Sequence, residues 1–310
     1  MVCIKILCVG LMVCDLMVKP VTEQALREDT SPAEMIRMQV GGDAFNVASN
    51  LAALGVETAL YSAVGRDAFG DFALAYAEKL GVPAQWIQKT DRPTSVTAVL
   101  IHPDGERNFV VQKGASQQLR EEEISDELLK AYDMIYIGSA CGLPELEGES
   151  LTRLLKRAKD LGRLTAMDIT GEALQEKASQ LLPALALLDY FLPSSYEAME
   201  LSGEKTPEAA AAYFHRHGVP VAVIKLGKQG ALLSDGRKQK RFSAYEGPVI
   251  DTTGAGDAFV SGFLAGISRE KELSDCVRLG NGAGALCVGK VGASGTLPAF
   301  KELSAFIGSD

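Results

Sequence analysis

Short apolar runs alternate along the chain with segments whose apolar residues have helical spacing. Residues 3–10 (CIKILCVG) form such a run and end in glycine, which is typical of a fully buried strand. The spacing predicts helices over 44–55 and 68–81, each closed by a glycine. Strand-like runs accompany further predicted helices at 146–162, 172–186, 195–201 and 207–217. This order predicts an α/β fold with three layers around a mostly parallel sheet.

Two segments break the alternation. Residues 14–20 (CDLMVKP) come directly after the first predicted strand, and residues 94–112 predict a hairpin around the turn PDGE. Consecutive strands inside an α/β chain indicate a small separate sheet. We therefore expect one domain over residues 1–310, in which this small sheet acts as a lid over a site at the carboxyl ends of the main strands.

Charge and composition exclude several function classes. The chain of 310 residues is 47% hydrophobic, enough for one large core, and its formal net charge of −9 comes with no block of basic residues. A nucleic-acid surface needs clustered Lys and Arg, so we expect no nucleic-acid partner. No segment approaches the roughly 20 apolar residues of a membrane span, so we expect no membrane partner either.

The cysteines and the apolar N-terminal segment bear on where the protein is located in the cell. Six cysteines are scattered without a CxxC pair, which predicts reduced thiols in a cytoplasmic protein. The start MVCIKILCVGLMVCDLMV has the apolar character of a leader, but Asp15 interrupts it and no A-x-A cleavage site follows. A first core strand is the interpretation that this segment favours.

The common phosphate-binding motifs are missing. The GK pairs at 227–228 and 289–290 are followed by Gln229 and Val291, where a Walker loop requires Ser or Thr. GNGAGA (280–285) fits the pattern GxGxxA, but it follows a helical segment rather than a strand. Chance or close helix packing explains that match better than a dinucleotide site.

The segment DTTGAGDAF (251–259) combines two acids with a glycine turn before an apolar helix. Gly254, Ala255 and Gly256 fall at the helix N-terminus, where free N–H groups and the helix dipole attract anions. Asp257 in the first turn would point into the same place. An anion cradle beside a base suits phosphoryl transfer to a hydroxyl. The spacing also fits an acid that only caps a helix.

These residues resemble a known family. DTTGAGDAF resembles the C-terminal signature of the PfkB, or ribokinase-like, carbohydrate kinases, and GGDAFNVASNLAALG (41–55) resembles their N-terminal signature. SAVGRDAFG (62–70), LPSSYEA (192–198) and IKLGKQGA (224–231) follow in the order of that family. The resemblance covers essentially the whole chain. It implies a ribokinase-like fold and an ATP- and magnesium-dependent kinase that phosphorylates a hydroxyl of a small sugar or sugar derivative.

The resemblance also implies roles for single residues. Asp257 matches the catalytic base, and the anion hole for the γ-phosphate matches Gly254, Ala255 and Gly256. The positions that grip substrate hydroxyls match Asp15, Gly41, Gly42 and Asn46. The positions that surround adenosine match Lys225, Gly227, Gly230 and Asn281.

Two cation sites follow from the same resemblance. Glu197 is expected to hold Mg²⁺ through water, but Ser194 stands where the family motif N-x-x-E has an amide that positions phosphates. A monovalent-cation loop, which we expect to take K⁺, matches Asp251, Thr253, Gly292 and Thr296, with main-chain oxygens near Cys287 and Lys290. Alternatively, Lys290 places its own ammonium near this loop.

The substrate is only partly constrained. After the middle strand the chain has MDITGEAL, without the Asn and Arg of the D-x-N-x-R motif found in fructokinase-like members. Asp43, where ribokinase-like members have Lys, favours neutral polyols and disfavours phosphorylated substrates. Arg107 in the hairpin could reach a substrate carboxylate or phosphate, or lie solvated. GGDAFN and DGERNFV together resemble an uncharacterised sugar-kinase branch, so the sugar stays open.

Two other functions and one assembly are kept as hypotheses. A nucleoside kinase would use the same fold, although aromatic residues make up only 6% of the chain. The Ser194 departure also allows a sugar-sensing binding protein without catalysis. The alternating strand SVTAVLI predicts a small sheet with one apolar face and open edges, which favours a homodimer through the lid.

Overall fold

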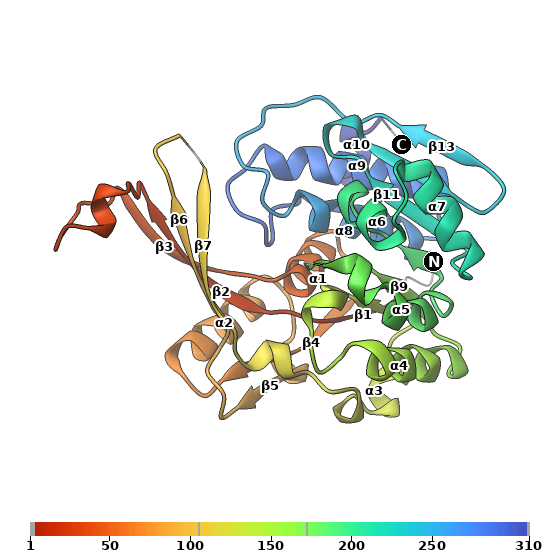
Figure 1. The fold of residues 1–310 in the computed structure, drawn as a ribbon, viewed down its shortest axis with the longest axis horizontal. Helices are drawn as coiled ribbons and strands as arrows, with labels where there is room; N and C mark the ends of the chain where they lie inside the picture. Colours follow the sequence, from red (N-terminus) through yellow and green to blue (C-terminus); the bar gives the residue numbers. More distant parts are fainter. Residues whose placement is uncertain (1–3, 105, 172, 309–310) are drawn as a thin grey trace.

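The computed structural model describes residues 4–104, 106–171 and 173–308, and it contains one large and one small sheet (Figure 1). The large sheet has nine strands in the order β13-β12-β11-β10-β9-β8-β1-β4-β5. Its pairs are parallel except at β11–β12 and β12–β13, which are antiparallel. Its strands are β1 (Ile6–Val9), β4 (Thr58–Gly65), β5 (Ile87–Thr90), β8 (Met134–Ile137), β9 (Leu164–Met167), β10 (Tyr190–Phe191), β11 (Val221–Lys225), β12 (Ala231–Ser234) and β13 (Gln239–Phe242).

Helices cover both faces of this sheet, so the predicted three-layer α/β fold is confirmed. One face packs on a core that includes Val47, Phe263 and Leu279, and the other on a core that includes Leu154 and Phe214. The first face carries α1 (Asp43–Ala53), α2 (Ala68–Lys79), α8 (Ala255–Ile267), α9 (Leu273–Val288) and α10 (Phe300–Phe306). The second carries α3 (Asp126–Lys130), α4 (Gly148–Asp160), α5 (Leu174–Leu185), α6 (Ser195–Ser202) and α7 (Pro207–Arg216).

The helix boundaries lie close to those that the spacing predicts. Glu172, the first residue of the helix predicted over 172–186, lies outside the described residues, and α5 begins at Leu174. GNGAGA lies inside α9, where a Cβ on Gly280 would approach the Phe259 ring to 2.9 Å. The glycine match therefore reflects close packing of α9 against α8.

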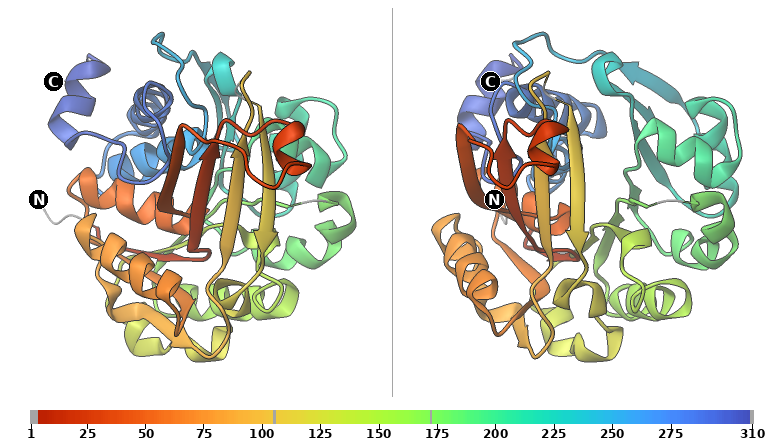
Figure 2. Two further views of the ribbon diagram at one scale, coloured as in Figure 1. Left: turned by 90° about the vertical axis from the view of Figure 1, so that its left-hand side faces the viewer. Right: turned by 60° about the vertical axis from the view of Figure 1, so that its left-hand side comes forward.

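The small sheet has four strands in the order β3-β2-β6-β7, shown side by side in red and yellow in Figure 2. β2 (Val13–Lys19), β6 (Val96–Ile101) and β7 (Arg107–Gln112) fall in the two segments from which we expected it. Gly105 of the predicted turn lies outside the described residues.

The edge strand β3 (Met35–Gly41) is missing from the sequence prediction, so the expectation of two contributing segments was wrong: the sheet has three. β3 pairs antiparallel with β2 from Met35 to Gly41 and leads directly into α1. Its first three residues are half-buried or exposed, so its side chains give little of the alternation that identifies a strand. This strand brings the Gly41-Gly42 turn beside Asp15 of β2.

In the three described stretches of the chain, no helix is both long and apolar enough to cross a bilayer.

Candidate active site

Several of the predicted site residues, among them Ser194 and Lys225, lie at the carboxyl ends of β8 to β11, together with residues that were not predicted. Ser139, Asp168 and Ser194 follow β8, β9 and β10 by two, one and three residues, and Lys225 ends β11. The N-termini of α1 and α8 reach the same place, because these two helices pack against each other. In parallel α/β sheets this edge is where ligands bind.

Asp257 lies in the first turn of α8 and is 9% exposed. Asn46 of α1 donates a hydrogen bond from Nδ2 to Asp257 Oδ2 at 2.7 Å. Burial raises the pKa of Asp257 well above its ordinary value, and the charge of Asp43 raises it further. A carboxylate with a raised pKa can accept a proton, which is the property a general base needs.

The glycines before Asp257 shape the start of the helix. Gly254 is the N-cap of α8 with φ of +74°, a left-handed conformation that glycine adopts without strain. A Cβ on this residue would also collide with Ala293. The first N–H groups of a helix have no intrahelical partner, so the turn of Gly254, Ala255 and Gly256 next to Asp257 suits the predicted anion cradle, although the N–H of Ala255 donates to the carbonyl oxygen of Thr252 at 3.3 Å.

On the acceptor side, Asp15 of β2 lies against the Gly41-Gly42 turn. A side chain at Gly41 would collide with the Asp15 carboxylate, and Gly42 has φ of +97°. Burial raises the pKa of Asp15 to about 7. Asn46 Oδ1 is buried and has no hydrogen-bond partner among the described residues. Such an oxygen calls for a donor, and a substrate hydroxyl is one.

Three residues of this region were not singled out from the sequence: Ser139, Asp168 and Tyr136. Ser139 donates a hydrogen bond of 2.5 Å to Asp43, and its φ of +59° is unusual for a non-glycine residue. Burial raises the pKa of Asp43. The Tyr136 hydroxyl is buried, without a partner in the described part of the chain. All three follow or lie within buried strands, and Asp168 is also the aspartate of MDITGEAL, the segment compared above with the D-x-N-x-R motif.

Lys225, which the resemblance places near adenosine, directs its side chain into the site. Its ammonium pairs with the carboxylate of Asp168. A methyl group added to Gly256 would lie 3.6 Å from Lys225 Nζ, so the ammonium borders the anion cradle. Burial raises the pKa of Asp168 to about 7, although the charge of Lys225 opposes this effect.

The other residues expected to surround adenosine lie near β12 and β13. Gly227 and Gly230 flank a short turn and have positive φ, and a Cβ on Gly230 would collide with the Phe242 backbone. Asn281 of α9 donates from Nδ2 to the carbonyl oxygens of Phe242 at 3.2 Å and Ser243 at 3.0 Å. Its amide therefore fixes the end of β13.

Ser194 and Glu197 form a capping box at the start of α6. The Ser194 hydroxyl accepts a hydrogen bond from the N–H of Glu197 at 3.2 Å, and the Glu197 carboxylate accepts one from the N–H of Ser194 at 2.7 Å. One carboxylate oxygen is thus used for the helix, and the other is left for a water shell around a cation. This donor set fits Mg²⁺ held through water.

The loop expected to bind a monovalent cation already carries two protein cations. Arg107 of β7 donates to Asp251 Oδ1 at 2.6 Å and also contacts the Thr253 hydroxyl. Arg107 is 25% exposed, so it is neither solvated nor free to grip a substrate in this structure. Lys290 donates from Nζ to the carbonyl oxygen of Thr296 at 2.6 Å.

The Asp251 carboxylate also holds the loop together. Its oxygens accept hydrogen bonds from the N–H groups of Thr253 at 2.9 Å and Gly292 at 3.1 Å. Burial alone would raise the pKa of Asp251, but these bonds and Arg107 outweigh it, so the pKa is lowered. Because protein donors already bind the oxygens expected to face K⁺, the residues of this loop do not fit a potassium site.

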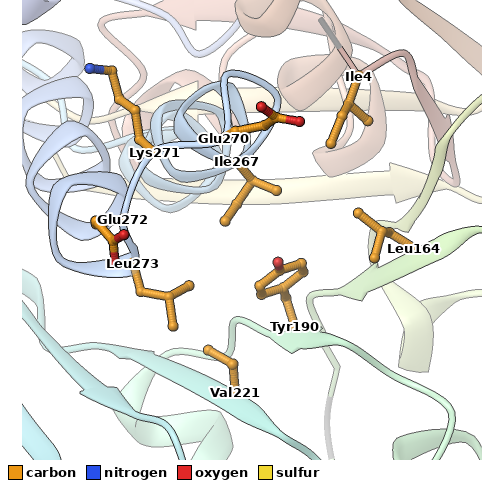
Figure 3. Close-up of a pocket in the computed structure, with 9 residues that line it drawn as sticks. All are labelled: Ile4, Leu164, Tyr190, Val221, Ile267, Glu270, Lys271, Glu272 and Leu273. Atoms are coloured by element: carbon orange, nitrogen blue, oxygen red, sulfur yellow. The ribbon is translucent and has the colours of Figure 1, made fainter. Parts of the chain in front are cut away.

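A cavity of about 360 Å³ lies at the opposite edge of the sheet (Figure 3). Leu164, Tyr190 and Val221, which line it, are the first residues of β9, β10 and β11. Ile267 and Leu273 close it from the helical side. None of the residues predicted for the active site lines this cavity.

Known proteins resemble the chain over nearly its full length. The sequence profile of the pfkB family carbohydrate kinases matches residues 4–299. An uncharacterized sugar kinase of Archaeoglobus fulgidus is 30% identical over 251 residues, which cover 80% of this chain and 98% of that protein. A ribokinase of Staphylococcus aureus is 27% identical over 275 residues, 85% of this chain and 86% of that protein.

Solved kinase structures also resemble this chain over nearly its full length. The structure of a ribokinase from Thermotoga maritima has a TM-score of 0.83 and 26% identity, and the match covers 99% of this chain and 100% of that one. A fructokinase from Vibrio cholerae gives a TM-score of 0.82 at 25% identity, covering 99% and 100%. The chain belongs to the pfkB family of carbohydrate kinases, a family of ATP-dependent phosphotransferases.

Proposed function

We propose that this kinase transfers the γ-phosphoryl group of ATP to a hydroxyl of a small neutral sugar or sugar derivative. The observation that carries this proposal is the position of Asp257, a buried carboxylate of raised pKa beside the glycine cradle of α8. Such a transfer releases a proton from the attacking hydroxyl and builds negative charge on the transferred group. The base takes the proton, and the anion cradle on the same helix turn stabilises the negative charge.

The residues divide the chemistry between them. Asp15 and Asn46 hold hydroxyls of the acceptor, and Asp257 takes the proton of the hydroxyl that attacks. The N–H groups of Gly254, Ala255 and Gly256 stabilise the negative charge of the transferred group. The small sheet covers the site and limits attack by water.

We place the adenosine near the Gly227–Gly230 turn and Asn281, and the magnesium near Glu197. Bound Mg²⁺ would offset the charge of the phosphate oxygens. In this chain Glu197 would hold its water shell while the capping box with Ser194 keeps the carboxylate fixed.

The acids of the acceptor side bear on the substrate class. Burial raises the pKa values of four acids, and for the last three the charges of nearby carboxylates raise them further: Asp15, Asp43, Asp168 and Asp257. An anionic acceptor would bring further negative charge to them. Since Arg107 is bound to Asp251, it does not offset this repulsion. A neutral polyol or sugar is therefore the class that the site favours.

The potassium dependence implied by the resemblance does not fit this loop, because Lys290 and Arg107 occupy it. We propose that exchange of KCl for choline chloride leaves the wild-type rate within about 2-fold. A Lys290→Ala variant removes the ammonium from the Thr296 carbonyl and should gain a response to KCl. A wild-type rate that falls at least about 10-fold without KCl would contradict this proposal.

We also propose a homodimer through the small sheet. Its edge strand β7 exposes three large apolar side chains in a row, Phe109, Val110 and Val111. An open edge strand with apolar side chains favours pairing with another chain. A monomeric mass in light scattering at micromolar concentration would contradict the dimer.

The experiment that tests the function measures ADP release with ATP and magnesium across sugars, sugar acids, polyols and nucleosides. We expect a neutral sugar or polyol to release ADP, and we expect the release to require Asp257. Nucleosides are included because the relatives also comprise a cytidine kinase of Thermococcus kodakarensis, 29% identical over 245 residues. A nucleoside as the best acceptor would favour that alternative, and tight sugar binding without ADP release would favour the non-catalytic one.

A further inference from the structure

The Lys225 ammonium has surroundings that adenosine binding does not explain. Its side chain is 13% exposed and that of Asp168, its ion-pair partner, is 8% exposed. Gly256, a member of the anion cradle, lies beside Nζ with only the missing side chain between them. A buried lysine is stabilised only by opposite charge, and here that charge stands directly next to the cradle.

Lys225 keeps its charge in this position. Burial lowers its pKa, but the attraction of Asp168 and Glu197 outweighs burial, and the pKa is raised. Carboxylates that repel the phosphates of a nucleotide also lie near it: Asp43, Asp168, Glu197 and Asp257. An entering phosphoryl group therefore meets attraction from Lys225 and repulsion from the acids behind it.

Ser194, which lies next to Lys225, has a hydroxyl where the family motif has a side-chain amide. Ser194 and Lys225 form a parallel β-bridge, and the N–H of Lys225 donates to the carbonyl oxygen of Pro193 at 2.9 Å. The Ser194 hydroxyl accepts the N–H of Glu197 in the capping box, so its single O–H is the only side-chain donor that it can offer a phosphate, where an amide would offer two. Lys225 lies next to this gap and can supply the positive charge.

We propose that Lys225 contacts the γ-phosphoryl group of bound ATP and keeps this contact during transfer; this rests on the proposed function. The bond between the γ-phosphorus and the bridging oxygen breaks, and its electron pair stays on ADP. A new bond forms between the phosphorus and the acceptor oxygen, whose proton passes to Asp257. Lys225 keeps its protons and offsets the charge of the moving group, and Asp168 holds it in place before ATP binds.

The test compares the binding of ADP with that of AMP-PNP, a non-hydrolysable ATP analogue, by calorimetry in the presence of magnesium. Lys225→Met should weaken AMP-PNP about 10-fold or more, because a hydrogen bond to a charged group is lost, and leave ADP within about 2-fold. The kcat of the same variant should fall more strongly than its KM rises. Lys225→Arg should restore most of the affinity for AMP-PNP.

Two further variants separate this role from a structural one. Lys225→Met with Asp168→Asn removes both charges and leaves no buried ion unpaired, so it serves if the single variant unfolds. Lys159 bonds Asp189 at 2.8 Å, just before β10 at the opposite edge of the sheet, and Lys159→Met is the matched control. It should leave both affinities unchanged.

The binding and activity results distinguish a failure of the Lys225 inference from a failure of the proposed function. Equal weakening of ADP and AMP-PNP in the folded double variant, or no weakening of either, overturns the role of Lys225. If the wild-type protein phosphorylates a sugar while Lys225→Met binds both nucleotides normally, only this inference fails. A wild-type protein that binds neither nucleotide overturns both the inference and the proposed function.

Discussion

Asp251 and Asp257 belong to the same short segment, six residues apart, but their carboxylates have opposite environments. Asp251, in the loop before α8, accepts hydrogen bonds from Arg107 and two backbone N–H groups, and its pKa is lowered. Asp257, in the first turn of α8, has Asn46 as a donor and the like charge of Asp43 nearby, and its pKa is raised.

The comparison shows that hydrogen-bond donors, rather than position in a motif, decide what each acid can do. With its donors, Asp251 stays ionised and ties the loop to β7 and to Gly292, which is a structural role. Asp257 lies in a site that disfavours its charge, so a proton taken from a substrate is stabilised there. The four predictions below test this contrast in order of decreasing effect.

Asp257→Asn should lower kcat by at least about 10²-fold, the usual scale for the loss of a general base, while nucleotide affinity is retained. The replacement keeps the size of the side chain and removes its ability to accept a proton. The measurement is steady-state ADP release, together with calorimetric binding of ADP. Asp275→Asn, in an exposed ion pair on α9, is the control and should be silent. Unchanged turnover in Asp257→Asn would exclude Asp257 from the mechanism.

Asp251→Asn should instead act on stability, with a loss of about 2 kcal/mol in the free energy of unfolding, because three charge-assisted bonds are weakened. Urea denaturation measures this loss. Arg107→Met should cost a similar amount, and the double variant less than the sum, since both changes remove the same pair. Strictly additive losses would mean that Arg107 and Asp251 do not act together.

Asp15→Asn should instead increase the free energy of unfolding. The pKa of Asp15 is raised to about 7 by burial, so its charge costs stability increasingly from about pH 4 to about pH 7 and fully above that. The amide removes this cost and should stabilise the protein by at least about 1 kcal/mol at pH 8, with little effect at pH 4. Sugar affinity should fall in the same variant. Equal stabilisation at both pH values would show that the charge is not the cause.

The fold was predicted well from the sequence because its strands and helices carry strong local patterns. The buried runs IKILCV and YDMIYI, and helices closed by glycine, identify the α/β order without tertiary knowledge. β3 was missed since an edge strand with exposed side chains has little periodicity of its own; its pairing with β2 defines it. The small sheet was therefore predicted with one strand too few.

For the site, the sequence located the chain segments but not the directions of their side chains. The signature around Asp257 has characteristic spacing, whereas Ser139 stands alone after a buried strand and Asp168 keeps only the aspartate of the D-x-N-x-R motif. The pairs Lys225–Asp168 and Arg107–Asp251 join positions 57 and 144 residues apart. Such pairs depend on how the sheets are arranged, so neither the Asp251 partner of Arg107 nor the Asp168 partner of Lys225 could be predicted from the sequence.

The smallest expected effect concerns the pH dependence of kcat/KM, whose acid limb reports the protonation of the free enzyme's base. Removing the charge of Asp43 in Asp43→Asn makes ionisation of Asp257 easier, so the apparent pKa falls and the acid limb moves to lower pH. Removing the donor in Asn46→Leu makes ionisation harder, so the limb moves to higher pH. Opposite shifts from two neighbours of one carboxylate identify Asp257 as the titrating base, even where both variants lose affinity for the sugar. Shifts in the same direction, or none, would mean that another group titrates and that the contrast between Asp251 and Asp257 does not control the reaction.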